Sequence, residues 1–130
     1  MGLLSFFEDK DVKRYRSVIA ESPEDASAHF YLGAAYEAKG RVKEAIEAFV
    51  ESVRLNPKSA EGHFNLGLLF EKVQDGKNAI FHITKAGSLF ANKSDPHNKE
   101  RAGKLLKKYY DKYGFKKEDI ADLDEDQNPS

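Results

Sequence analysis

The sequence contains an internal repeat with a period of 34 residues, and this feature constrains the fold more than any other. When residues 26–59 are laid over residues 60–93, matching positions carry identical or similar side chains. The matched positions include Ala26 with Ala60, His29 with His63, Phe30 with Phe64, Leu32-Gly33 with Leu66-Gly67, Tyr36-Glu37 with Phe70-Glu71, and Ala45-Ile46 with Ala79-Ile80. Self-similarity at such a period indicates supersecondary units that bury their apolar faces by stacking on a neighbour.

Each repeat is predicted to contain two helices. Apolar residues recur at three- and four-residue intervals from about Asp25 to Lys39, which is typical of an amphipathic helix. Gly40 is expected to end that helix, because glycine adopts positive φ without steric cost. A second helix is predicted from about Val42 to Leu55. It ends at Asn56-Pro57, because proline lacks an amide donor and restricts the residue before it.

The second repeat follows the same plan. Helices are predicted from about Ala60 to Val73 and from about Lys77 to Phe90, with Ser59 as the N-cap of the first. The repeat departs from its partner by carrying Gly76 in place of Val42. It also places Phe81 and Phe90 where the first repeat has polar residues, and we expect both rings to pack beneath the following helix.

Three flanking segments complete the organisation. Residues 1–22 are predicted to form an N-terminal helical half-repeat, because Ser22-Pro23 stands 34 residues before Asn56-Pro57. Residues 96–114 are predicted to form a C-terminal capping helix with an i, i+3, i+4, i+7 apolar stripe. Residues 118–130 contain few apolar residues and a run of acids, so a disordered acidic tail is predicted there.

Composition excludes several classes of protein. The chain has no cysteine, so it has no disulfide framework, thiolate metal site or cysteine nucleophile. Its formal net charge of −1 gives no global attraction to nucleic acid or to an anionic membrane. No apolar run approaches the about 20 residues that a membrane-spanning helix needs, and the opening segment lacks the features of a targeting signal. A cytoplasmic location is expected.

The spaced residues of both repeats resemble the tetratricopeptide repeat. The second repeat carries Ala60, Phe64, Leu66-Gly67, Phe70 and Ala79 in the positions of that motif, and the first repeat also keeps the terminal Pro57. The resemblance implies an all-α fold, a right-handed α–α superhelix of helix-turn-helix repeats. It also implies a protein–protein interaction module, an adaptor or scaffold that receives a peptide or helix of a partner in a concave groove.

In that family the groove is lined by the first helix of each pair. Carried onto this sequence, the predicted groove residues are Ser27, Phe30, Ala34, Glu37, Ala38, Glu61, Phe64, Asn65, Leu68, Glu71 and Lys72. An apolar strip rimmed by glutamates favours a ligand segment with basic flanks. Alternatively, the aromatic residues pack against neighbouring helices, and the C-terminal helix covers the strip. Only Asn65 matches the clamp with which some members grip the terminal carboxylate of heat-shock chaperones, so that ligand is not expected.

Catalysis and metal binding have little support in the sequence. His29 and His63 are register equivalents, but two imidazoles make an incomplete metal site, and we predict structural roles for both. His82 and His97 are isolated in the pattern. Because no phosphate loop, nucleophile elbow or HExxH motif is present, we predict neither an enzyme nor a cofactor.

Two other function classes stay open. The first is a self-assembling, homo-oligomeric module that uses terminal apolar residues, namely Leu3, Leu4, Phe6 and Phe7, or Phe81 and Phe90. The second and weaker one is a nucleic-acid-associated accessory protein. It would use the basic residues between Lys99 and Lys117 together with Tyr109, Tyr110 and Tyr113. The abrupt change from basic to acidic residues at Lys117-Glu118 suggests that the tail folds back on this basic face and competes with a partner.

Overall fold

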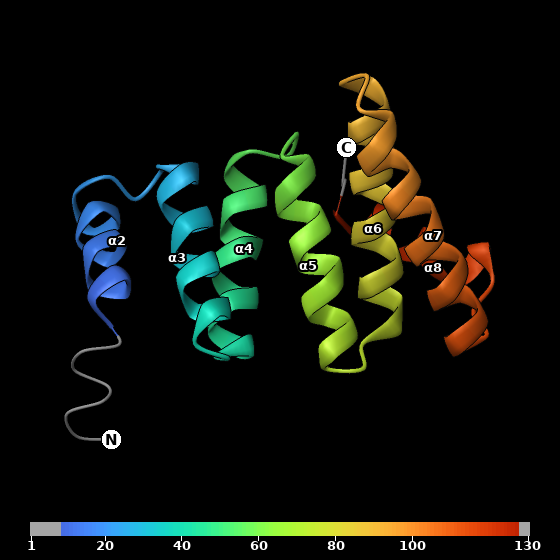
Figure 1. The fold of residues 1–130 in the computed structure, drawn as a ribbon, viewed down its shortest axis with the longest axis horizontal. Helices are drawn as coiled ribbons and strands as arrows, with labels where there is room; N and C mark the ends of the chain where they lie inside the picture. Colours follow the sequence, from blue (N-terminus) through green and yellow to red (C-terminus); the bar gives the residue numbers. More distant parts are fainter. Residues whose placement is uncertain (1–8, 128–130) are drawn as a thin grey trace. The chain divides into compact units, whose positions relative to one another are not determined.

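A computed structural model describes residues 9–127, with side chains through Leu123. All regular structure in this range is helical, and none of it is strand. The helices are α2 (Lys10–Glu21), α3 (Ala26–Ala38), α4 (Val42–Leu55), α5 (Ala60–Lys72), α6 (Gly76–Asn92), α7 (Pro96–Tyr113) and α8 (Lys117–Gln127) (Figure 1).

The chain divides into two compact units, Met1–Pro57 and Lys58–Ser130. In the first unit α3 packs against α2 and α4, and in the second α6 packs against α5, α7 and α8. The pairs α3–α4 and α5–α6 lie within the segments predicted as repeats, residues 26–59 and 60–93 (Figure 1). The predicted all-α class of helix-turn-helix repeats, with a preceding half-repeat helix and a following helix, is confirmed.

Short polar residues cap the starts of four helices, and a glycine follows the end of α3. The side chains of Asp25, Ser59, Asp75 and Asp95 each accept a hydrogen bond from the backbone N–H three residues later. This satisfies one of the amide donors that a helix start leaves without a partner. Gly40 ends the first helix of the first pair with φ of +73°, as predicted.

The core of the first unit lies between α3 and α4. Phe49 on α4 is fully buried, and its ring lies against Gly33 of α3. A Cβ atom on Gly33 would approach the Phe49 ring to 2.9 Å, so the small residue allows the close approach of the two helices. From α2, Val12 is also buried at 2% exposure, which attaches the half-repeat helix to this unit.

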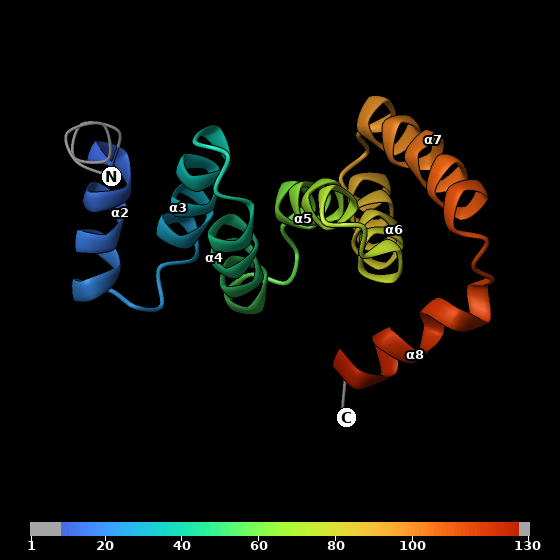
Figure 2. The same cartoon turned by 90° about the horizontal axis from the view of Figure 1, so that it is seen from below.

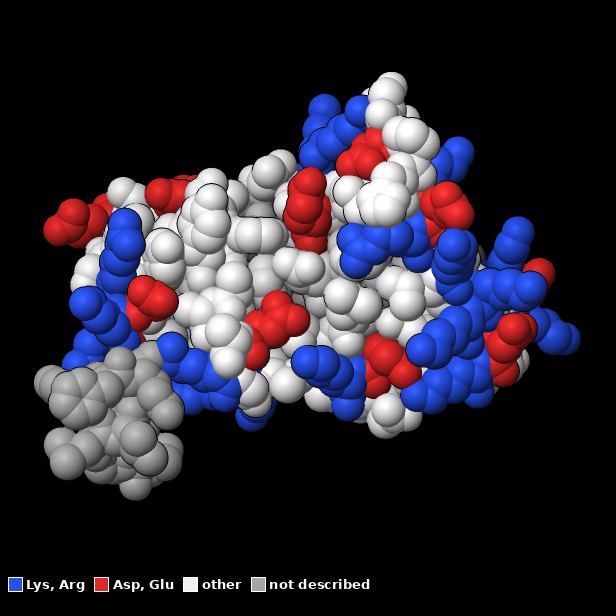
Figure 3. All heavy atoms as spheres, viewed as in Figure 1, with Lys and Arg blue, Asp and Glu red and all other residues white. Residues whose placement is uncertain are grey.

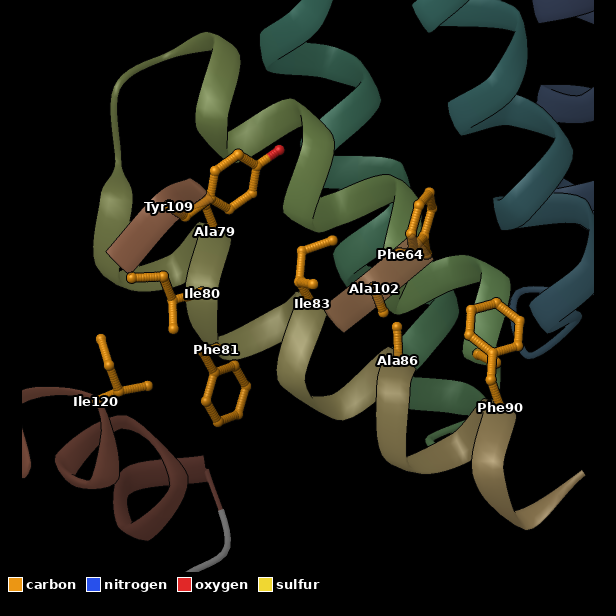
Figure 4. Packing of buried hydrophobic residues seen from close by; sticks show 11 residues of the cluster. Phe64, Ala79, Ile80, Phe81, Ile83, Ala86, Phe90, Ala102, Tyr109 and Ile120 are labelled. Carbon is orange, nitrogen blue, oxygen red and sulfur yellow. The ribbon is translucent and has the colours of Figure 1, made fainter. Parts of the chain in front are cut away.

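The core of the second unit is a cluster to which four helices contribute. Figure 4 shows its buried residues converging from α5, α6, α7 and α8. They are Ala60, Phe64, Ala79, Ile80, Phe81, Ile83, Ala86, Phe90, Ala102, Tyr109 and Ile120. Phe81 and Phe90 are 4% and 3% exposed, so the prediction that both rings pack beneath the following helices is confirmed.

The acidic tail is the segment that the sequence prediction misjudged. Where residues 118–130 were predicted to be disordered, α8 extends to Gln127, and Ile120 is buried at 7% exposure. The backbone N–H of Lys116 donates to Asp119 Oδ2, which is the acidic half of a capping box. The acids at the start of α8 therefore stabilise a helix, and Ile120 attaches it to the core.

Candidate functional site

In the first unit, α3 presents a face that is only partly covered. Phe30 is half-buried and meets the ring of Phe49 edge-on at 5.3 Å between centroids. Beside it, Tyr31 is 51% exposed and stacks on Tyr15 of α2 at 5.5 Å. Farther along the helix, Ala34 is half-buried and has only a methyl side chain. The face combines the aromatic surface of Phe30 and Tyr31 with the small side chain of Ala34.

In the second unit, side chains of α7 contact the matching face of α5 at Phe64 and Glu71. Phe64, the register equivalent of Phe30, is only 6% exposed. The guanidinium of Arg101 on α7 lies 4.9 Å from the centre of its ring, and Phe90 of α6 meets it edge-on. A cation over an aromatic face is an attractive contact. Phe64 thus serves the interior of its own unit.

Glu71, near the end of α5, also contacts side chains of α7. Its carboxylate accepts hydrogen bonds from Lys112 Nζ and from the Tyr113 hydroxyl. Burial acts to raise the pKa of Glu71, but these two donors outweigh it and hold the pKa below its usual value. The Tyr113 ring also lies over Gly76, where a Cβ atom would clash at 2.5 Å. This contact explains why the second repeat has glycine where the first has Val42.

The other predicted groove residues retain solvent contact within their own units. Those exposed are Ser27, Ala38, Glu61 and Lys72, and those half-buried are Glu37, Asn65 and Leu68. Glu61 also lies 3.9 Å from Lys93 in an exposed ion pair. That the two sets form one shared groove stays a prediction.

A pair of histidines lies buried between α5 and α6. His63 and His82 are 7% and 4% exposed, and their Nδ1 atoms are 3.0 Å apart, so one donates and the other accepts. Burial, followed by the proximity of His63 and of Lys85, lowers the pKa of His82 to about 3. Phe70 stacks on His82 at 5.5 Å. Both imidazoles are packed between helices of the second unit.

This pair revises one expectation. His82 is not isolated, because the fold brings it to His63. In contrast, His29 of the first unit is half-buried, and its Nε2 lies 3.0 Å from the carbonyl of Pro23. Among the residues that the structure describes, no group of three or more His, Cys, Asp or Glu side chains could hold a metal ion.

The basic helix α7 uses much of its length for contacts within its unit. Figure 3 shows Lys and Arg side chains gathered over this part of the molecule. However, Tyr109 is 2% exposed and Tyr113 is bonded to Glu71, so neither ring is free to stack on a nucleic-acid base. Lys104 and Lys112 are paired with acidic side chains. The nucleic-acid alternative receives no support from these residues.

The residues proposed for self-assembly fall into two groups. Phe81 and Phe90 are buried within their own unit and are not a free apolar end. Leu3, Leu4, Phe6 and Phe7 lie outside the described residues. Over residues 9–127, no helix combines the length and apolarity needed to cross a lipid bilayer.

Comparisons with known proteins agree with this architecture. The tetratricopeptide repeat family model matches residues 12–60. The type III secretion translocator chaperone SycD of Yersinia enterocolitica has the same fold, with a TM-score of 0.76 and 18% identity over 86% of this chain and 78% of that chain. No curated protein sequence matches at a significant level.

Two structures of MamA are also similar. A double mutant described as MamA RS-1 ArsTM is 33% identical over 61% of this chain and has a TM-score of 0.59, and the match spans only 44% of that chain. A second MamA structure is 21% identical over 78% of this chain and 66% of its own, with a TM-score of 0.57. Residues 12–60 therefore match the tetratricopeptide repeat family, and the chain as a whole shares its helical-repeat fold with SycD.

Proposed function

We propose that this chain is a protein–protein interaction module that binds a peptide or helix of a partner protein through the α3 face. The observation that carries the proposal is the contrast between Phe30 and Phe64. Phe30 is half-buried and flanked by the exposed ring of Tyr31, whereas α7 covers Phe64. An accessible aromatic surface beside small residues suits a partner's apolar side chains.

The chemistry of the α3 face narrows the partner. Phe30 and Tyr31 offer apolar surface, and Ala34 leaves room for a side chain to approach the helix. Glu37 lies one turn farther along and is half-buried, and α3 itself contains no lysine or arginine. A segment with an apolar residue followed by a lysine or arginine fits this order. Complementary charge at the rim acts mainly on the rate and specificity of binding.

We extend the proposal to the α5 residues that keep solvent contact, which are Glu61, Asn65, Leu68 and Lys72. Phe64 and Glu71 would reach a ligand only by exchanging their contacts with Arg101, Lys112 and Tyr113. The α3 residues are thus the principal binding residues. The roles of adaptor or scaffold, and a cytoplasmic location, stay predictions.

The test uses peptides selected from a random display library and titrated into isotope-labelled protein. We expect amide chemical-shift changes to cluster on α3, at Ser27, Ala34 and Ala38. An Ala34→Arg substitution should weaken binding at least tenfold, because the long side chain fills the strip. Glu47→Arg on the exposed side of α4 is the matched control and should leave binding unchanged.

Three results would count against the proposal. Selected peptides could shift only α4 residues, or they could bind the Ala34→Arg variant as tightly as the wild type. The library could also yield no binder, while light scattering shows a dimer that Ala34→Arg dissociates. The last result would assign the α3 face to a second copy of the chain.

A further inference from the structure

The helix α8 differs in charge from helices α6 and α7. It carries six acidic residues and one lysine, and its apolar residues are Ile120, Leu123 and the small Ala121. Helices α6 and α7 together carry eight basic residues and two acidic ones, and α6 contains no acid at all. Of these bases, Lys85 of α6 lines the same cavity as Ile120 and Ala121, so positive charge borders the acidic helix α8.

The contact of α8 with the rest of its unit is narrow. It packs against α6, and Figure 2 shows it running back from the end of α7 across that helix. Ile120 is buried among the core residues, and Leu123 is half-buried. Figure 4 places Ile120 beside Ile80 and Phe81 of α6. Two apolar side chains three positions apart thus attach α8 to its unit.

A cavity remains next to this contact. It has a volume of about 540 Å³ and is lined mainly by apolar surface of Phe81, Leu106, Tyr110 and Ile120. The ammonium of Lys85 lies over the Phe81 ring at 5.5 Å, and burial, with the charge of Glu118, raises the pKa of Tyr110. Because protein interiors are normally close-packed, α8 fills the surface of α6 and α7 only in part.

The connection and length of α8 suit a displaceable element. Three residues, 114–116, join it to α7, beginning with Gly114 at φ of +69°. At 11 residues α8 is shorter than the about 12 to 15 that give even marginal helicity in isolation, so its structure depends on packing. Elements with few buried contacts open at low free-energy cost.

We propose that the α6–α7 surface beneath α8 is a docking site for an acidic amphipathic helix of a partner protein, and that α8 is its built-in competitor. The partner helix carries apolar residues three positions apart, flanked by carboxylates, and fills the cavity that α8 leaves. This site is separate from the α3 face, and the proposal does not depend on it.

The probe is a fluorescein-labelled peptide with the sequence of residues 115–127, which stands in for the partner helix. It is titrated into the full-length wild type and into an Ile120→Ser variant, and binding is followed by fluorescence polarisation. The substitution removes the buried anchor of α8, so the docking surface is open more often. Because apparent affinity scales with the open fraction, we expect the peptide to bind the variant at least tenfold more tightly.

Matched variants make the result specific. Ala121→Ser, at an exposed position of α8, should bind like the wild type. A peptide whose acids are changed to asparagine and glutamine should bind at least tenfold more weakly, and salt should weaken the acidic peptide alone. If circular dichroism shows that Ile120→Ser loses helical structure, Leu123→Ser is the second variant. Leu123 is half-buried, so its substitution should detach α8 with less damage to the core. Ala34→Arg on α3 should leave peptide binding unchanged, which separates this proposal from the first.

Equal affinity of the peptide for the wild type and both release variants would overturn the proposal, as would no binding to either variant. Equally tight binding of the neutral peptide would overturn the proposal that the partner helix is acidic. A concentration-dependent dimer of Ile120→Ser that the free peptide dissolves would assign the site to a second copy of this chain.

Discussion

The two helix pairs share one 34-residue plan but differ in what lies on their first helices. On α3, Phe30 is half-buried and Tyr31 is exposed. On α5, the matching Phe64 lies beneath Arg101, and Glu71 accepts a hydrogen bond from Tyr113 of α7. The same repeat position can therefore serve as surface in one pair and as interior in the other, depending on the helix that follows.

The sequence differences between the repeats mark this change of role. Gly76 replaces Val42 where the Tyr113 ring packs, and Phe81 replaces Glu47 where α8 attaches. A polar residue that becomes aromatic between copies therefore indicates a contact with a flanking helix. Substitutions at matched positions test how far this difference extends.

The largest expected effect on stability is at the glycines where the two helices of each pair approach closely. A Cβ atom on Gly67 would lie 2.4 Å from Ile83 and 3.2 Å from the backbone oxygen of Ala79. Gly67→Ala should therefore lower the free energy of unfolding by about 3 kcal/mol. For Gly33→Ala the nearest atoms belong to the Phe49 ring, at 2.9 Å, and the loss should be about 1 kcal/mol. Urea unfolding measures the stability loss of each variant. Equal losses would contradict a closer approach of the helices at Gly67 than at Gly33.

The next effect is a dependence on pH that belongs to the second pair. The pKa of His82 is about 3 in the folded protein and about 6.5 when unfolded. Only the unfolded chain binds the proton between these values, so stability is complete above pH 6.5 and is lost as pH falls. From pH 7 to pH 5 the loss should be about 2 kcal/mol.

Unfolding by urea at several pH values measures this loss. His82→Leu should reduce the dependence, whereas His29→Gln in the first pair should preserve it. An unchanged pH profile for His82→Leu would show that the buried imidazole is not its origin.

Substitutions in the turn within each helix pair should have smaller effects on stability, and these effects should be opposite in sign in the two pairs. Gly40 has φ of +73°, and the matching Gln74 adopts +62° despite its side chain. Positive φ costs a residue with a Cβ atom about 1 kcal/mol. Gly40→Ala should therefore lose about 1 kcal/mol, and Gln74→Gly should gain up to about 1 kcal/mol. Thermal unfolding measures both changes, and a loss for Gln74→Gly would show that its hydrogen bond to the Glu71 carbonyl outweighs the strain.

The smallest expected effect is at the glutamates. Glu71→Gln weakens the bonds to Lys112 and Tyr113, but the side chains of Glu71 and Lys112 are 20% and 41% exposed. The expected loss is only about 0.5 kcal/mol. Glu37→Gln, at the matching position of the first pair, should change stability less. Thermal melts of both variants provide the comparison, and a larger loss at Glu37 would reverse it.

The repeat architecture could be predicted from the sequence because local signals agree with one another. Apolar periodicity, short polar caps and Asn56-Pro57 place α4 at its observed bounds, Val42–Leu55. The predicted start of α5 at Ala60 is also the observed one, with Ser59 as its cap. Each of these signals lies within a few residues of the boundary that it sets.

The contacts that were missed all depend on tertiary packing. The helical state of α8 rests on Ile120 reaching the core, which its acidic composition conceals. His82 stands 34 residues after the buried Ala48, so its register contained a signal that it faces inward. Coverage of the α5 face likewise required knowing where α7 lies, which no local pattern supplies.

The most direct test of the difference between α3 and α5 is fluorine NMR of protein that carries 4-fluorophenylalanine. A soluble paramagnetic agent broadens the signals of solvent-accessible rings, and single Phe→Leu variants assign the resonances. The signal of Phe30 should broaden strongly, and that of Phe64 should be protected. Equal broadening of the two signals, or stronger broadening of Phe64, would contradict an open α3 face and a covered α5 face.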